Sequence, residues 1–323
     1  MSDTVFTNAS DPSFVAGVDG GGTKSRCVLA DMQGNTISKV EGGPCNQLLI
    51  GADAAARNVV QLLTACCGNV GCPPAALHAV VLGLAGAGVG PDRDHLLRTL
   101  RALLAQSGLT ALSISLDTDA RIALEGAFEG KSGVVVIAGT GSVVLGKSSS
   151  GSLVRIGGWG RILGDEGSGY HVGREALRAV ARDLDGMGSS GVLRSLLASR
   201  EGLDTRDRIL RVVYGQQLGL SSLAPLVLEG AESGDTVCRR ILQEAANALA
   251  DQVRAAVDSI SSGETIGVVP LGGLVERGTP YSRVLEGAIQ RHCPGVEIRK
   301  PLRTPVEGAV WMALGLAGDR HVS

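Results

Sequence analysis

Short apolar runs bounded by glycine open the chain and are followed by longer stretches with helical spacing. Residues 14–18 and 25–31 are predicted as strands, and a turn at Gln33-Gly34-Asn35 leads into a third strand at 37–40. The opening is therefore a β-meander. Apolar residues three or four positions apart predict helices at 52–67 and 92–106, and buried strands are predicted at 78–84 and 112–116.

The same pattern recurs after Asp119. A helix is predicted through residue 127, and strands follow at 133–138, 143–147 and 153–156. Helical patterns fill most of 170–260, and the longest runs from Val237 to Ile260. The last predicted elements are strand 266–271, helix 281–293, strand 296–300 and helix 306–316. A duplicated α/β domain explains this recurrence.

Composition narrows the class of protein. A chain of 323 residues exceeds what one core usually serves, so we expect two domains with a ligand-binding cleft. The 30 basic residues nearly balance 32 acidic ones and form no run, which disfavours nucleic acid as a partner. The polar start predicts no signal peptide, and residues 79–90 are too short and glycine-rich to cross a membrane. We expect a soluble cytoplasmic protein.

The seven cysteines are an odd number and are scattered along the chain, which argues against a disulfide framework. Cys66, Cys67 and Cys72 form one local cluster that suits zinc, with His78 as the one further candidate ligand. Small buried or half-buried thiols are the favoured interpretation.

Two glycine turns are candidate phosphate sites. The first, Asp19-Gly20-Gly21-Gly22-Thr23-Lys24, has Lys and Thr in the wrong order for a Walker A loop, yet its amides can surround an anion. Asp19 beside it is a candidate Mg²⁺ ligand. The second turn, Gly139-Thr140-Gly141-Ser142, again joins two apolar strands. Each alone is equally typical of an ordinary hairpin, but a pair at equivalent places favours function.

With these segments in view, the sequence resembles the N-acetylglucosamine kinase and BadF/BadG-type ATPase family, within the superfamily of actin, hexokinases and heat-shock ATPases. The resemblance covers nearly the whole chain. It is carried, in family order, by Val18 to Lys24, Asn46, Asp117-Thr118-Asp119-Ala120, Gly139 to Ser142, Gly157-Gly158-Trp159-Gly160, Gly164-Asp165-Glu166-Gly167-Ser168 and Gly272-Gly273.

The resemblance implies a duplicated actin-like ATPase (ribonuclease H-like) fold, with one lobe at 1–119 plus 305–323 and the other at 120–304. It implies an ATP site between the lobes, with Mg²⁺ at Asp19, both glycine turns on the phosphates and Gly272-Gly273 near the adenosine. Asp119 would act as base toward the sugar hydroxyl. The remaining sugar-contacting positions would be Asn46, Thr140, Gly158, Trp159, Gly160 and Asp165.

Three of these assignments have plainer alternatives. Asp119 is also suited to be a helix N-cap, and Trp159 to pack in a core. Asp165 and Glu166 are also typical of a solvated turn that caps a helix. Related N-acetylglucosamine kinases often carry Asn where this chain has Val143, so free glucosamine competes with N-acetylglucosamine as the substrate.

We therefore expect an ATP-dependent kinase acting on the 6-hydroxyl of N-acetylglucosamine or glucosamine. A homodimer is also expected. One alternative is a dehydratase-activating ATPase, which needs thiolates for an iron–sulfur cluster. Another is a nucleotide-dependent sugar sensor without turnover.

Overall fold

The computed structural model describes residues 13–87, 91–109, 112–215, 218–261, 263–275 and 278–318. Contacts divide the chain into a first unit, residues 1–131 and 301–323, and a second unit, residues 132–300. The expected lobe boundaries were 119/120 and 304/305. Helix α4 (Asp119–Phe128) joins the first unit because it packs against α11 (Pro305–Gly318).

The first unit is built around a five-stranded sheet in the order β3-β2-β1-β4-β5. Strands β1 to β3 are antiparallel, whereas β4 and β5 run parallel to β1. Its other elements are β1 Phe14–Gly20, β2 Ser25–Asp31, β3 Thr36–Gly42, α1 Gln47–Ile50, α2 Ala52–Gly68, η1 Pro74–Ala76, β4 Leu77–Leu84, α3 Pro91–Gln106 and β5 Ser113–Asp117.

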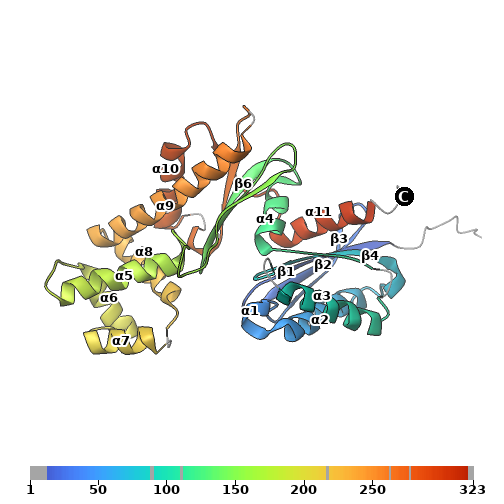
Figure 1. The fold of residues 1–323 in the computed structure, drawn as a ribbon, viewed down its shortest axis with the longest axis horizontal. Coiled ribbons are helices and arrows are strands. Elements are labelled where there is room, and N and C mark those ends of the chain that lie inside the picture. The colour runs from blue at the N-terminus through green and yellow to red at the C-terminus, as the bar shows by residue number, and fades with distance from the viewer. Residues whose placement is uncertain are drawn as a thin grey trace, which may run out of the picture. The chain divides into compact units, whose positions relative to one another are not determined.

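Helices cover both faces of this sheet (Figure 1). Apolar side chains of α2 and α3 form one buried cluster with one face, and α4 and α11 form another with the opposite face. Because the pleat alternates side chains, Val18 faces the first cluster while its close neighbour Val15 faces the second. Burial on both faces explains why β1 reads as a continuous apolar run.

The second unit repeats the sheet pattern in the order β10-β9-β6-β7-β8. Strands β6 to β8 form the antiparallel meander, and β9 runs parallel to β6. Its elements are β6 Gly133–Ala138, β7 Ser142–Lys147, β8 Leu153–Gly157, α5 Gly169–Leu184, α6 Val192–Glu201, α7 Arg206–Tyr214, η2 Leu220–Leu223, α8 Ala224–Glu232, α9 Thr236–Ile260, β9 Gly267–Leu271, η3 Gly273–Val275, α10 Pro280–His292 and β10 Glu297–Ile298.

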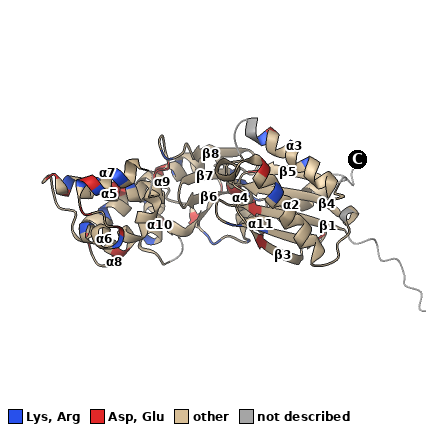
Figure 2. Ribbon diagram, turned by 90° about the horizontal axis from the view of Figure 1, so that it is seen from below, with Lys and Arg blue, Asp and Glu red and all other residues tan. Residues whose placement is uncertain are grey.

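One large apolar cluster joins this second sheet to helices α5, α8, α9 and α10. The long helix α9 lies along β6, β7 and β8, as its apolar stripe predicts. Oppositely charged side chains four residues apart form ion pairs on the exposed faces of the helices, for example Arg211 with Asp207 at 2.6 Å on α7 (Figure 2). Such exposed pairs contribute only about 0.3–0.5 kcal/mol each. The apolar cluster therefore dominates the stability of this unit.

The predicted duplication is thus confirmed as two sheets with the same strand pattern. In each, a three-stranded meander is followed by strands parallel to its first strand, and the carboxyl ends of the parallel strands lie at one edge. Ligands in open α/β sheets bind outside such edges. The two glycine turns lie at these edges, because one follows β1 and the other follows β6.

Candidate functional site

In the first unit, the carboxyl ends of β1 and β5 carry the acidic candidates. Asp19 lies next to the end of β1, and Asp119 follows β5 as the first residue of α4. The two carboxylates lie close enough for Asp119 to raise the pKa of Asp19. Burial of Asp19 is the larger cause of that rise, and the nearby Arg26 opposes it. A partly buried acid beside a second acid is a natural place for a divalent cation.

Asp119 is exposed and does not cap its helix. The N-cap of α4 is Thr118, whose hydroxyl accepts from the amide of Arg121 at 3.1 Å. Asp119 instead has its Oδ1 2.9 Å from the amide nitrogen of Ala120. The alternative interpretation of Asp119 as the helix N-cap is therefore wrong, and the Asp119 carboxylate is accessible.

The first glycine turn is fixed by its neighbours in the same unit. The carbonyls of Gly20 and Gly21 accept from the amides of Ala85 and Cys45 at 2.8 and 3.0 Å. A Cβ on Gly20 would stand 2.3 Å from a methyl of Leu84, so this position has no room for a side chain. The turn is thereby held at the edge of the sheet, with Thr23 and Lys24 exposed.

Asn46 lies beside this turn. It caps the short helix α1, with its Oδ1 accepting from the amide of Leu48 at 2.9 Å. Its Nδ2 is 4.0 Å from where a Cβ of Gly22 would stand. The structure thus brings together Asp19, Asp119, the first turn and Asn46 in one unit.

In the second unit, four hydrogen bonds join the second glycine turn to the loop that carries Asp165 and to the start of α5, the helix that follows this loop. The amides of Gly169 and Tyr170, at the start of α5, donate to the carbonyls of Gly139 and Thr140 at 2.8 and 3.1 Å. In return, the Ser142 amide donates to Asp165 Oδ1 at 3.3 Å, and the Ser142 hydroxyl donates to the carbonyl of Glu166 at 2.7 Å. Hydrogen bonds therefore tie the turn to the loop and to the helix after it.

These bonds decide which groups of the turn face a ligand. Both donors of Ser142 are used within the protein, and the Gly139 amide donates to the carbonyl of Gly141 at 2.9 Å. Within the described part of the chain, the amides of Thr140 and Gly141 have no protein acceptor. An anion at this turn would therefore be bound by those two amides.

Asp165 is buried, and its backbone has a φ of 61°. Burial raises its pKa; the amide of Ser142 opposes the rise, and the charge of Glu166 adds to it. The cap of α5 is Ser168, whose hydroxyl accepts from the amide of His171. Asp165 is therefore not the solvated, helix-capping turn residue that the alternative interpretation required.

Trp159 is 75% exposed, which makes the core-packing alternative wrong. It shares its loop with Ile162 and Leu163, which are 85% and 77% exposed. The carbonyl of Gly158 accepts from Arg155 Nη2 at 3.0 Å, and this anchors the start of the loop. The loop thus presents apolar side chains outward beside a buried carboxylate.

Gly272 and Gly273 follow β9, and Gly272 lies against Ala138, the residue just before the second glycine turn. A Cβ on Gly272 would stand 2.4 Å from the carbonyl oxygen of Ala138, and its φ of 104° is one that side chains rarely permit. A Cβ on Gly273 would meet nothing within 4 Å. The end of β9 is therefore held against the end of β6, with open space above Gly273.

One residue that supports the Asp165 loop was not indicated by the sequence. Tyr281, fully buried on α10, donates its hydroxyl hydrogen to the carbonyl of Gly167 at 2.8 Å. Its partner lies 114 positions away in the chain. No local pattern encodes such a pairing, although a fully buried Tyr usually has a hydrogen-bond partner.

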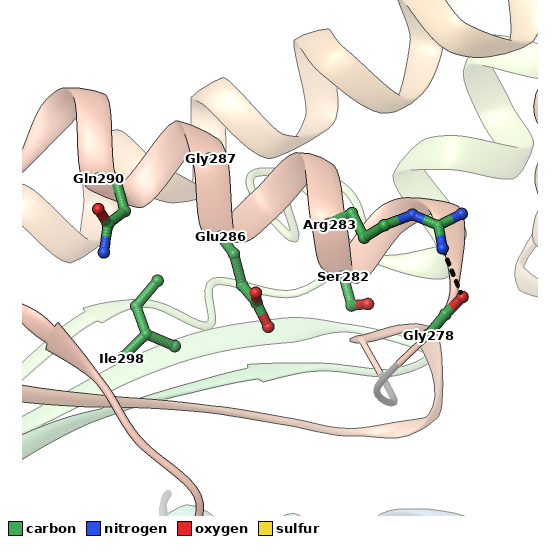
Figure 3. A pocket seen from close by; sticks show the side chains of 7 residues that line it. All are labelled: Gly278, Ser282, Arg283, Glu286, Gly287, Gln290 and Ile298. Carbon is green, nitrogen blue, oxygen red and sulfur yellow. Dashed lines mark hydrogen bonds between the residues drawn. The ribbon is translucent and has the colours of Figure 1, made fainter.

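A cavity of about 610 Å³ lies along α10, also in the second unit. Figure 3 shows Glu286 and Gln290 directed from the helix toward the segment that carries Ile298. None of the predicted site residues lines it; its lining is Gly278, Ser282, Arg283, Glu286, Gly287, Gln290 and Ile298. This cavity is therefore separate from the candidate site.

The cysteine cluster gives no metal site. Cys66 and Cys67 are buried and Cys72 is half-buried, as the favoured interpretation expected. Among the described residues, no three His, Cys, Asp or Glu side chains are grouped so that they could hold a metal ion. In the same residues, no helix combines the length and apolar composition needed to cross a bilayer.

Comparison with known proteins identifies the family to which the chain belongs. Residues 16–313 match the model of the BadF/BadG/BcrA/BcrD ATPase family. The chain is 31% identical to the N-acetyl-D-glucosamine kinase of Dictyostelium discoideum, over 92% of this chain and 97% of that one. It is 30% identical to the N-acetylmuramic acid/N-acetylglucosamine kinase of Clostridium acetobutylicum, over 81% and 85%.

Solved structures support the same fold. A Chromobacterium violaceum protein provisionally named an N-acetylglucosamine kinase matches with a TM-score of 0.71 and 27% identity, over 94% of this chain and all of that one. A ROK family glucokinase from Streptomyces griseus, at 16% identity, matches with a TM-score of 0.58 over 95% and 100%. The expected duplicated actin-like ATPase fold is confirmed.

Proposed function

The chain belongs to the BadF/BadG/BcrA/BcrD ATPase family, and on that premise we propose that it transfers the γ-phosphoryl group of ATP to the 6-hydroxyl of an amino sugar. The observation that carries the proposal is the pair Asp19 and Asp119, whose charges interact beside the first glycine turn. Phosphoryl transfer needs a carboxylate near the nucleophile and neutralisation of phosphate charge. Asp119 would meet the first requirement, and Mg²⁺ held by Asp19 would meet the second.

Asp119 is the proposed base. Its accessible carboxylate orients the sugar hydroxyl and accepts its proton while the 6-oxygen forms a bond to the γ-phosphorus. The bond from that phosphorus to the bridging oxygen breaks, and ADP leaves. A positioned base of this kind contributes roughly 10²–10⁴ in rate.

Asp19 is the proposed residue for Mg²⁺. Its carboxylate fits a cation because its pKa is raised by burial and by a second carboxylate, so a bound positive charge would relieve both effects. When bound, Mg²⁺ neutralises charge on the phosphates. Omission of Mg²⁺ from the assay should therefore abolish turnover, and adding it back should restore it.

The remaining predicted residues take roles that agree with their surroundings. The first turn, residues 20–24, and the amides of Thr140 and Gly141 would bind phosphate oxygens, while Ser142 holds its turn. Gly272 and Gly273 would face the adenosine. We propose sugar contacts for Asn46, Asp119, Thr140, Gly158, Trp159, Gly160 and Asp165.

Residues of the second unit bear on which amino sugar is the substrate. Val143 lies against Gly158, 3.1 Å from where a Cβ of that glycine would stand, and so places a methyl group in the proposed sugar site. A methyl group there offers no hydrogen bond to an acetamido group. Glucosamine is accordingly as good a candidate as N-acetylglucosamine, and the chain is also 28% identical to the glucosamine kinase of Vibrio cholerae, over 72% of this chain and 77% of that one.

A panel of sugars in a coupled ADP-release assay tests the proposal. Glucosamine, N-acetylglucosamine, N-acetylmuramic acid and glucose would be compared, and the product would be located at O6 by phosphorus NMR. ATP hydrolysis that no sugar stimulates would contradict the kinase. Tight ATP binding with no turnover of any sugar would instead support a sensor.

The dehydratase-activating alternative gains no support from the cysteines. Such a protein needs accessible thiolates for its cluster. Six of the seven cysteines, all except Cys72, are buried here. The sugar-kinase proposal therefore remains the better one.

A further inference from the structure

The loop that carries Asp165 ends in an unusual helix start. Ser168 is the N-cap of α5, and its hydroxyl accepts from the amide of His171 at 3.1 Å. The imidazole of His171 reaches back, and its Nδ1 accepts from the amide of Gly167 at 2.8 Å. In an ordinary capping box a Glu or Gln makes the returning contact. Here the returning acceptor is a side chain that titrates near neutral pH.

The contact fixes the state of the ring. A backbone N–H can only donate, so Nδ1 must carry a lone pair and the ring proton must be on Nε2. His171 is half-buried, and burial lowers its pKa. The charge of Arg174 lowers the pKa further. Three acids oppose the shift: Glu175 on the same helix, Glu166 in the loop and Glu244 on α9.

The loop needs external support. Asp165 has a φ of 61°, a conformation that non-glycine residues rarely adopt and that persists only when the surroundings enforce it. Both backbone groups of Gly167 are held, the carbonyl by Tyr281 and the amide by His171. The pKa of Tyr281 is raised by burial, so of these two supports only His171 changes charge near neutral pH.

We propose that His171 is a positioning residue for the sugar, whose neutral imidazole accepts the Gly167 amide hydrogen and so keeps Asp165 in place. This inference rests on the proposed role of Asp165 in sugar binding. A proton on Nδ1 replaces the acceptor by a second donor, which faces the Gly167 N–H and breaks the contact. Acid then loosens the Asp165 loop before the fold is lost, and sugar affinity falls.

Steady-state kinetics from about pH 5 to 8 test the inference. In the wild type, the KM for the sugar should rise as the pH falls below the ordinary range of His. His171→Gln keeps an acceptor oxygen that does not titrate, so its KM should stay near the wild-type value at neutral pH and lose the part of the acid rise that belongs to His171. Asp165 keeps its own titration in both proteins.

His171→Leu removes the acceptor and should raise the KM for the sugar about five- to tenfold at every pH, with a much smaller change in the KM for ATP. His292→Gln is the matched control, because His292 pairs with Asp251 on the surface and should retain the wild-type profile. Thermal melts of all three variants separate loss of sugar binding from loss of folding.

Nitrogen NMR of labelled protein reads the ring directly. The expected result at neutral pH is a neutral His171 with its proton on Nε2; a proton on Nδ1 would overturn the inference. An unchanged acid rise in His171→Gln would overturn it as well. If no sugar is phosphorylated, the kinase proposal and the sugar role of His171 both fall, whereas an active kinase with an unchanged His171→Gln profile removes this inference alone.

Discussion

The two sheets have the same strand pattern, yet their glycine turns have different chemical surroundings. The first turn stands beside two carboxylates, Asp19 and Asp119, whose charges interact. The second turn is bonded to the start of α5 and to the Asp165 loop, and it presents backbone amides. One duplicated scaffold has thus placed charge at one edge and dipoles at the other. Substitutions at the two turns should therefore have different consequences.

Asp119→Asn should break the first turn's role most completely. Turnover should fall by at least about 10², with ATP binding largely kept, because the amide cannot accept the proton. Asp117→Asn is the matched control. The Asp117 Oδ1 accepts only from the adjacent Thr118 amide among the hydrogen bonds described, so activity should change far less. Near-normal turnover in Asp119→Asn would remove the base from the mechanism.

Gly20→Ala and Gly139→Ala compare the two turns directly. The first has no room for a methyl group between Leu84 and Cys45, so it should destabilise the fold by about 1–3 kcal/mol in denaturant unfolding. The second should fold normally, since its Cβ would meet no atom within 4 Å. Destabilisation of both to the same degree would contradict the difference.

Gly139→Ala should still impair nucleotide use. If phosphates approach the second turn, the added methyl group stands near them, and the KM for ATP should rise by roughly tenfold, equivalent to about 1.4 kcal/mol. Isothermal titration with a non-hydrolysable ATP analogue measures the same effect without turnover. An unchanged ATP affinity would show that the nucleotide does not approach this face of the turn.

Asp19→Asn should have a small and favourable effect on stability. The pKa of Asp19 is raised in the folded protein, so its contribution to stability is present at low pH and is lost as the pH rises through the folded pKa. The amide removes that loss, and melting at neutral pH without nucleotide should rise by about 2–4 °C. Turnover should be lost, and the gain in Tm should vanish at acidic pH.

Much of the fold was predictable because both sheets follow simple periodic patterns. Strand 25–31 and helix α9 were predicted to within a residue, since a short continuous apolar run specifies the strand and a long apolar stripe specifies the helix. The two-residue β10 is shorter than predicted, because it pairs only with β9 at Gly267 and Val268. The short helix α1 was not predicted, since four residues are too few to show a period.

The candidate site divided in the same way. Short motifs indicated Asp19, Asp119 and the two turns, because each motif lies within a few consecutive residues and can be recognised in the sequence. The residues that hold the site in place could not be recognised in the sequence. Tyr281 donates to the carbonyl of Gly167, which is far away in the chain. Ser142 was predicted to bind phosphate, but its two donors bond to Asp165 and to the carbonyl of Glu166. Such contacts arise from tertiary packing, which no short pattern encodes.

The joining of the second turn to the Asp165 loop limits how this protein could be redesigned. A substitution within 157–168 that admits a new sugar also shifts the carbonyls and amides that shape the Gly139 to Ser142 turn. Altered substrate preference in that segment would therefore come with altered nucleotide affinity.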